Sequence, residues 1–337
     1  MKKCNLFLLS LCTIVFISCT PASNERFIEN TGRAQGSTYQ IKYLSPDGTD
    51  FGNQFENIFA EIDRSMSTYV PTSLISMVNK GDTLVTVDSM FIEVLKRSLE
   101  IAEETNGSFD PTIGPIVRLW GFGFDEVRSD VTDEMVNEIK SKTGYLNVSV
   151  SGLDVSLPAG FNLDFNAIAQ GYTVDYLAEF LEKSGVERYM IEVGGEVRAS
   201  GTNESGNVWK IGVDKPTEDI DQQDRFQFII TLEDASLATS GNYRKFWIDE
   251  ETGARYSHTI DPQTGYPARN ELLSVSIVAP SAMDADAYAT VCMVVGLSRC
   301  QDLLESKSDL EGYLIYDNGN GVWETSITEG FQLFIQE

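Results

Sequence analysis

The sequence predicts an α+β protein in which largely antiparallel sheets are flanked by helices. Segments with helical periodicity and segments with strand periodicity are interspersed along the chain, without the strict strand-helix-strand alternation that produces a parallel sheet. The 337 residues, of which 42% are hydrophobic, are enough to bury a large core. We therefore expect one large domain, or two closely packed lobes.

The chain begins with a segment typical of protein export. Two lysines precede an apolar stretch, residues 6–17, that ends just before Cys19. The stretch is too short for a membrane span, which needs about 20 apolar residues. We interpret residues 1–18 as a lipoprotein signal peptide, Cys19 as the lipidated first residue of the mature protein, and residues 19–30 as that cysteine and a polar tether. A plain secretory signal or an uncleaved anchor is the alternative.

The elements of the domain follow from the spacing of apolar residues. Recurrence three and four positions apart predicts helices at residues 55–66, 91–102, 167–181 and 284–295. Alternation or β-rich composition predicts strands at residues 39–44, 146–150, 189–193, 208–213, 226–232, 273–278 and 313–316.

The composition is strongly acidic, with a formal net charge of −26 at pH 7. Such a surface repels nucleic acid, so we exclude nucleic-acid binding. An anionic small ligand, such as a dinucleotide, would need a metal ion or a local basic group to offset the field.

Two cysteines remain after Cys19, namely Cys292 and Cys300, eight positions apart. On one continuous helix they would lie about 12 Å apart, which is too far for a disulfide. We therefore expect buried free thiols, although an exported protein is able to form disulfides.

Two motifs contain more glycine, proline and hydroxyl residues than packing requires. Backbone amides at Gly36 are able to approach an anion, and Tyr69, at the end of the first predicted helix, is able to stack on a flat ring. Residues 107–115 lead into the aromatic and glycine-rich residues 119–124 and favour a pocket for a planar ligand. The structural alternatives are a turn at Gly36, an aromatic plug at Tyr69 and a rigid turn under the core.

A third motif, residues 162–172, runs from an acidic strand through a turn into a helix. The first amides of a helix are unpaired and favour phosphate, so this helix start is a candidate anion site. Asp164 is alternatively an ordinary helix cap. Gly194 and Gly195, after a predicted strand, mark another place where the backbone is able to approach a ligand closely.

A fourth motif opens the last long helix. Asp286 and Thr290 are four positions apart, so a carboxylate and a hydroxyl share one helix face. Magnesium is commonly held by one or two protein oxygens together with substrate phosphates and waters. The alternative is that acids at a helix start only complement the helix dipole, as we expect for Asp284.

His258 is the only histidine in the chain, so it is the obvious group for proton transfer near neutral pH. It lies among polar and turn-forming residues, where a lone histidine is alternatively a hydrogen-bonded polar residue at a strand end.

Six motifs occur in order along roughly residues 33–337, and together they resemble the FAD:protein FMN transferase family, also called ApbE-like. They are residues 66–69, 109–112, 164–172, 240–243, 257–262 and 285–290. Six ordered motifs are far more specific than any one of them. The resemblance implies a T-fold-like architecture over residues 31–337, and members are typically exported or periplasmic lipoproteins of bacteria. This agrees with the reading of Cys19 and implies a lipoprotein on a periplasm-facing membrane of the cell envelope.

The resemblance implies a magnesium-dependent transfer of FMN from FAD to a threonine or serine hydroxyl of an acceptor protein, with release of AMP. The acceptor would be a subunit of a membrane redox pump or an FMN-binding domain. His258 would be the general base for the acceptor hydroxyl, and Asp261 would orient it. Two alternatives stay open: an FAD pyrophosphatase that yields FMN and AMP, and a surface lipoprotein that only binds flavin.

Residue by residue, the resemblance places the metal on the backbone carbonyl of Ala167 and the side chains of Asp286 and Thr290. It places FAD against Gln35, Tyr69, Ser108, Phe109, Asp110, Asp164, Gln170 and Ile260, with Gly194 and Gly195 lining the pocket. The chain departs from the family at Gln35-Gly36-Ser37, where many relatives have Met-Gly-Thr, and at Gln170, where a charged residue is common. The first departure changes the residue type at position 35, and the second removes one charge near FAD.

Overall fold

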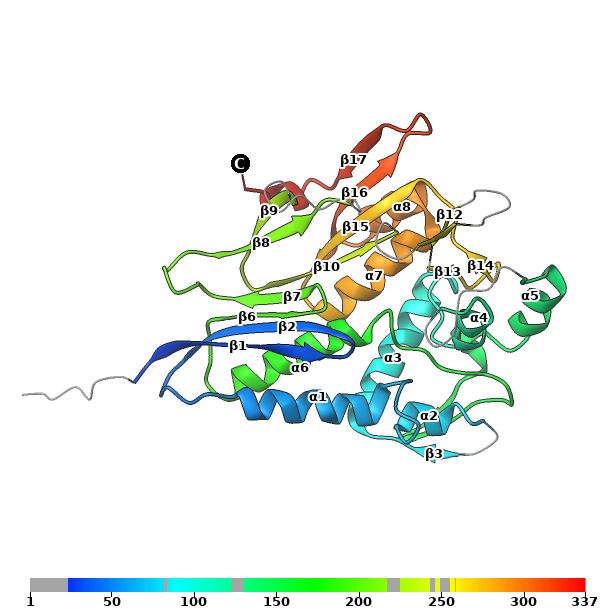
Figure 1. Cartoon of the computed structure of the whole chain (residues 1–337), viewed down its shortest axis with the longest axis horizontal. Helices are drawn as coiled ribbons and strands as arrows, with labels where there is room; N and C mark the ends of the chain where they lie inside the picture. The colour runs from blue at the N-terminus through cyan, green and yellow to red at the C-terminus, as the bar shows by residue number, and fades with distance from the viewer. Residues whose placement is uncertain are drawn as a thin grey trace, which may run out of the picture.

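The structure, a computed structural model, describes residues 24–81, 84–122, 130–216, 225–242, 246–248, 255–257 and 259–336. Its centre is an eight-stranded sheet in the order β1-β2-β6-β7-β10-β15-β16-β17, in which every neighbouring pair is antiparallel (Figure 1). The strands are β1 (Arg26–Ala34), β2 (Ser37–Ser45), β6 (Tyr189–Val193), β7 (Glu196–Ser200), β10 (Ala235–Gly241), β15 (Leu272–Ala279), β16 (Glu311–Asp317) and β17 (Trp323–Ile327). The predicted α+β class is confirmed.

Helices cover one face of this sheet. α6 (Ala169–Lys183) and α7 (Ala282–Val295) pack directly against the strands, and α1 (Gly52–Met66) and α3 (Ser89–Glu104) form a further helical layer (Figure 1). The main core lies between them and includes Ile277 of the sheet. α7 is apolar on nearly all sides because other elements surround it, whereas α1 has a polar outer face.

A second core covers the opposite face of the sheet. The antiparallel ribbon of β8 (Trp209–Asp214) and β9 (Phe226–Leu232) packs there with η2 (Phe331–Leu333). Val197 and Ala199 of β7 belong to this second core. Because side chains alternate along a strand, Glu196 and Arg198 of β7 must point to the other face, toward the helices.

A third, smaller cluster packs beside the main domain body. It joins α4 (Gly114–Leu119) and α5 (Asp133–Lys140) to the hairpin of β13 (Ile260–Asp261) and β14 (Tyr266–Pro267). The indole of Trp120 lies in this cluster and donates a hydrogen bond of 2.8 Å to the carbonyl of Gly265. The remaining elements are α2 (Leu74–Val78), β3 (Val85–Thr86), η1 (Tyr145–Asn147), β4 (Ser149–Ser151), β5 (Asp154–Ser156), β11 (Phe246–Ile248), β12 (Arg255–Ser257) and α8 (Leu297–Ser306).

The four predicted helices are all present as α1, α3, α6 and α7, each within a few residues of the expected bounds. Six of the seven predicted strands correspond to β2, β6, β8, β9, β15 and β16, whereas the seventh, residues 146–150, is mostly a 3-10 turn that leads into β4. The expected tether to residue 30 is too long, because β1 begins at Arg26 and pairs along its whole length with β2. Residues 1–23, which include the predicted signal and Cys19, lie outside the described residues. Within the described ranges, no helix combines the length and apolar character that a membrane crossing requires.

Candidate functional site

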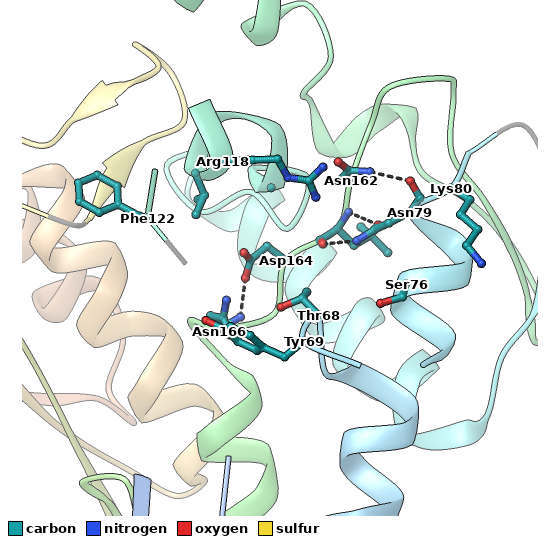
Figure 2. A pocket seen from close by; sticks show the side chains of 13 residues that line it. Thr68, Tyr69, Ser76, Asn79, Lys80, Arg118, Phe122, Asn162, Asp164 and Asn166 are labelled. Carbon is teal, nitrogen blue, oxygen red and sulfur yellow. Dashed lines mark hydrogen bonds between the residues drawn. The ribbon is translucent and has the colours of Figure 1, made fainter. Parts of the chain in front are cut away.

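A cavity of about 410 Å³ opens between α2, α4 and the segment that precedes α6. A volume of this size is typical of small-molecule sites. Figure 2 shows the side chains that line it, among them Tyr69 and Asp164, two of the predicted FAD contacts. Tyr69 is 58% exposed, so much of its ring is accessible from outside the protein.

The cavity also contains two basic residues, Lys80 and Arg118, in an otherwise strongly acidic protein. Burial raises the pKa of Asp164, while the amide of Asn166, which donates a 2.8 Å hydrogen bond, and the charge of Arg118 act in the opposite direction. Asp164 thus closes a local turn and lies in the cavity wall, but it is not the cap of α6, which begins five residues later at Ala169. The two cations supply the local positive charge that an anionic ligand would require.

The loop that follows α3, residues 105–113, is held in place by the side chain of Asp110. Both carboxylate oxygens of Asp110 are engaged, one by the amide and hydroxyl of Thr112 (2.8 and 2.6 Å) and the other by the amide of Tyr145 (3.1 Å). Ser108 and Phe109 are buried. Asp110 therefore holds two loops together, and any contact of this side chain with FAD would be additional to those bonds.

Two hairpin turns of the large sheet, β1–β2 and β6–β7, contact the first turns of α6. Gln35, in the β1–β2 turn, has a left-handed backbone (φ 51°), and its Nε2 donates a 2.8 Å hydrogen bond to Thr173 of α6. Its Oε1 is buried without a hydrogen-bond donor among the described residues. Gln170 lies against Gly194, where a Cβ atom would come within 2.3 Å of Gln170 Nε2. Gln35, Gln170 and Gly194 therefore lie close to the first turns of α6, and Gly195 follows Gly194, but none of these four predicted FAD contacts lines the cavity described above.

The predicted metal residue Asp286 reaches the same helix start from α7. Its Oδ2 accepts a 3.1 Å hydrogen bond from the amide of Gly171, in the first turn of α6. Ile168, the residue that precedes the helix, provides no side-chain cap, so Asp286 caps α6 from the neighbouring helix. The approach requires glycine, because a Cβ atom at position 171 would lie 2.2 Å from the carbonyl oxygen of Ala282.

Asp286 is buried together with a second acid, Glu196 of β7. Burial raises the pKa of Asp286 to about 7. Burial and then the charge of Asp286 raise the pKa of Glu196 well above its usual range. No basic side chain of the described residues contributes to either shift. Two adjoining buried acids without a cationic partner favour the binding of a proton or of a metal ion.

The other two predicted metal residues, Ala167 and Thr290, are close in sequence to Gly171 and to Asp286, respectively. Ala167 belongs to the turn immediately before α6, four residues from Gly171. Thr290 follows Asp286 by one turn on α7, and its hydroxyl is 3.5 Å from that of Ser240 in β10. The described parts of the chain hold no group of three or more His, Cys, Asp or Glu side chains suited to a metal, so a cation would also need carbonyl or hydroxyl oxygens.

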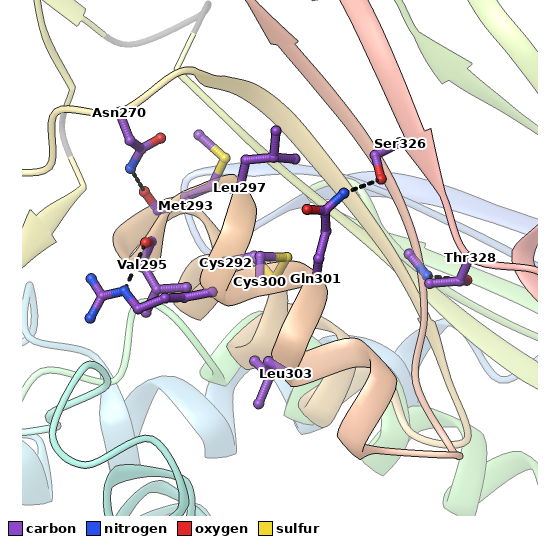
Figure 3. Close-up of a disulfide and its surroundings, with 12 residues drawn as sticks. Asn270, Cys292, Met293, Val295, Leu297, Cys300, Gln301, Leu303, Ser326 and Thr328 are labelled. Carbon is purple, nitrogen blue, oxygen red and sulfur yellow. Dashed lines mark hydrogen bonds between the residues drawn. A yellow bond between two sulfur atoms is a disulfide. The ribbon is translucent and has the colours of Figure 1, made fainter.

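α7 is held at its far end by a disulfide, which corrects the expectation of free thiols. Cys292 and Cys300 are bonded with an S–S distance of 2.13 Å and a Cα–Cα distance of 4.8 Å (Figure 3). The expectation assumed one continuous helix through both cysteines. Instead α7 ends at Val295, Gly296 turns the chain with a φ of 80°, and α8 brings Cys300 back beside Cys292.

His258 lies outside the described residues, whereas the residues on either side of it, 255–257 and those from 259 on, are described. Ile260 is buried in the third cluster, and β13 contacts α7. The carboxylate of Asp261 accepts from the amide of Gln263 (2.8 Å) and the hydroxyl of Thr264 (3.0 Å), within its own hairpin. Gln263 Nε2 in turn donates to the carbonyl of Asn106 (2.9 Å) and to the hydroxyl of Ser108 (3.5 Å), which ties the hairpin to the start of the loop of residues 107–115.

Three charged residues of this region were missed by the sequence reasoning, namely Lys80, Arg118 and Glu196. Glu196 had a visible signal, since an acid directly follows Gly194 and Gly195 and begins a strand that continues with Val197. Lys80 and Arg118 had none, because α2 and α4 are brought to one cavity only by the tertiary fold.

Comparison with known proteins gives consistent matches over most of the chain. The sequence profile of the ApbE family matches residues 35–314. The FAD:protein FMN transferase of Vibrio cholerae serotype O1 is 37% identical over 286 residues, which cover 82% of this chain and 84% of that protein. The solved structure of the flavin transferase ApbE from Vibrio cholerae has a TM-score of 0.82 and 33% identity and covers 92% of this chain and 99% of that one. The apo flavinyl transferase ApbE of Pseudomonas stutzeri has a TM-score of 0.83 and 30% identity, with coverages of 92% and 97%.

Proposed function

The chain belongs to the ApbE family and is an FAD:protein FMN transferase, and we propose that it works with Mg²⁺ bound at Asp286 and releases AMP. One observation carries the proposal about the site. Residues 164–171 contact the cavity at one end, through Asp164 and Asn166, and Asp286 at the other end, through the amide of Gly171. A flavin ligand in the cavity and a cation at Asp286 would therefore lie at the same helix start.

The residues around Asp286 fit a divalent cation. Its carboxylate is buried, accepts a single backbone hydrogen bond and has no basic partner among the described side chains. The carbonyl of Ala167 and the hydroxyl of Thr290 would supply further oxygen ligands of the kind that Mg²⁺ prefers. When bound, the ion supplies positive charge that stabilises the phosphoryl group and the departing AMP.

The protein's own part is to bind, to orient and to move one proton. Lys80 and Arg118 give the cavity local positive charge, and Tyr69 offers an aromatic face. The acceptor hydroxyl forms a new oxygen–phosphorus bond to the FMN phosphate, and the bond from that phosphorus to the oxygen of AMP breaks. We propose that His258 takes the hydroxyl proton. Positioning of this kind is the main protein contribution to phosphoryl transfer.

We further propose that the acceptor is a subunit of a membrane redox pump or an FMN-binding domain, flavinylated on threonine or serine. The lipobox-like residues before Cys19 support a lipid-anchored, periplasm-facing location in a bacterial envelope. Replacing Cys19 by serine is expected to release the protein from the membrane fraction. Retention of the Cys19→Ser variant in that fraction would contradict lipid anchoring.

The activity is tested with the chain from residue 20, FAD, Mg²⁺ and an FMN-binding acceptor domain. We expect a fluorescent flavin band that survives denaturing electrophoresis, together with one equivalent of AMP. An acceptor whose target hydroxyl is removed by alanine replacement is the control and should give no band. Free FMN and AMP without a band on the intact acceptor would instead indicate an FAD pyrophosphatase.

A further inference from the structure

Glu196 is a buried carboxyl group to which the transfer chemistry above gives no role. It is 8% exposed, and its Oε2 has no hydrogen-bond donor among the described residues. A buried polar atom without a partner is rare in folded proteins, and a missing ion or water is a common reason for it. Glu196 therefore has an open coordination position inside the protein.

The strand geometry directs this side chain to the site. Val197 and Ala199 of β7 pack in the second core, so Glu196 and Arg198 point to the helical side. Arg198 shows the direction, because its guanidinium donates a 2.7 Å hydrogen bond to Asp175 of α6. β7 also packs against α7, the helix that carries Asp286.

The basic residue closest to Glu196 in sequence does not neutralise it. Arg198 pairs with Asp175 and also lies 3.7 Å from Glu182. The charged groups that act on Glu196 within the described structure are Asp286 and Glu192, and both are negative. Removing one carboxylate from water without a partner is unfavourable, and the negative charge of a second buried carboxylate that acts on it makes it more so.

We propose that Glu196 is a second carboxylate ligand of the cation that Asp286 holds. This inference rests on the proposed function, because it assumes the cation at Asp286. Two carboxylates balance the charge of one divalent ion, whereas Asp286 alone would leave a net positive charge in a buried place. The pair therefore also favours a divalent over a monovalent cation.

The test measures metal binding without FAD or acceptor, so activity does not enter the readout. Mn²⁺ is the probe, and the signal of the free ion in electron paramagnetic resonance reports how much is bound to the chain from residue 20. We expect Glu196→Gln to weaken Mn²⁺ binding by at least about 10- to 100-fold, because a loss of that size already follows when a group that only supports a metal ligand is removed.

Glu192→Gln is the matched control. It removes the same charge from β6, four residues away, and its side-chain oxygen is still able to accept the 2.8 Å hydrogen bond from the amide of Gly195. A ligand role predicts that Glu192→Gln changes the Mn²⁺ affinity much less than Glu196→Gln does. Equal losses in both variants would show a general field effect and would overturn the proposal.

Asp286→Asn distinguishes a failure of the proposed role of Glu196 from a failure of the metal site at Asp286. If Asp286→Asn abolishes Mn²⁺ binding and Glu196→Gln leaves it unchanged, the role of Glu196 is wrong and the metal site stands. If neither variant changes binding, the metal assignment itself fails. Where Glu196→Gln does not fold, as judged by circular dichroism, Glu196→Asp keeps the charge on a shorter side chain, and unchanged affinity in that variant would count against direct ligation.

Discussion

Asp175 of α6 accepts a 2.9 Å hydrogen bond from the backbone amide of Met283, in the first turn of α7. The same carboxylate accepts from the amide of Ala282 (3.0 Å) and from the guanidinium of Arg198 in β7 (2.7 Å). One side chain therefore joins two helices and the sheet. Because Asp286 follows one turn later on α7, the position of the proposed metal site depends on this junction.

We expect Asp175→Ala to destabilise the protein strongly, because Arg198 and two amides lose their partner together. Breaking a largely buried ion pair from one side costs about 3–5 kcal/mol. The free energy of unfolding in urea checks this. Asp302→Ala, at an exposed position of α8, is the control and should leave the urea midpoint unchanged. Similar midpoints for both variants would mean that the junction is not important for stability.

Gly171→Ala tests the close approach of α6 and α7. The added Cβ atom would lie 2.2 Å from the carbonyl oxygen of Ala282, so the helices must separate and Asp286 must move away from the α6 start. We expect a loss of about 1–3 kcal/mol in stability, as for other overpacked sites, and weaker Mn²⁺ binding. Gly152→Ala has open space around it but a φ of 64°, so it should lose stability through backbone strain alone and keep its metal affinity.

Asp286→Asn is expected to abolish magnesium-dependent FMN transfer, while FAD binding measured by flavin fluorescence is retained. The amide oxygen is still able to accept from Gly171, so the cap of α6 is preserved while the charge is lost. Asp284→Asn removes the same charge two residues earlier, where the carboxylate faces Arg97 at 2.7 Å, and should keep the dependence on Mg²⁺. Unchanged turnover of Asp286→Asn at saturating FAD would refute the metal assignment.

For His258→Ala we expect FAD binding to be retained and transfer to fall by about 10²- to 10⁴-fold, the usual contribution of a general base. The measurement pairs flavin fluorescence titration with the covalent flavin band. A parallel loss of binding and transfer would make His258 a ligand contact instead of a base.

The buried Asp110 predicts a pH dependence of stability in the absence of FAD. Burial raises its pKa in the folded state above the usual value of 3.8, despite the bonds from Thr112 and Tyr145. Its contribution to stability is therefore fully present below pH 3.8 and is lost as the pH rises through the raised value. Asn does not titrate, so the free energy of unfolding of the wild type should fall relative to Asp110→Asn across this window and then level off. Urea unfolding between pH 3 and 7 checks the sign, and a relative rise would contradict it.

The sequence predicted the long elements well because their signal is local. α1 repeats Phe55, Ile58, Phe59 and Ile62 on one face, and that periodicity alone specifies an amphipathic helix. That Asp286 and Thr290 lie on one face of α7 could be predicted in the same way, because residues four positions apart on a helix share a face.

The features that were missed depend on how separate elements meet. The disulfide depends on the end of α7 at Gly296, and a helix end inside an apolar run is hard to locate from sequence. Glu196 becomes notable only when β7 lies against α7 and both acids are buried together. Likewise, the role of Asp110 in joining two loops through Thr112 and Tyr145 depends on the tertiary fold, while its predicted contact with FAD stays a prediction.

The early start of β1 has a consequence for where the enzyme is able to work. The paired strand begins at Arg26, so only six residues, 20–25, lie between Cys19, the proposed lipid attachment point, and the sheet. Even fully extended, the seven residue-to-residue steps from Cys19 to Arg26 span at most about 25 Å. In an enzyme anchored through Cys19, the start of β1 thus stays within about 25 Å of the lipid surface, so the acceptor must bring its target hydroxyl to a site carried by a sheet that is held close to the membrane.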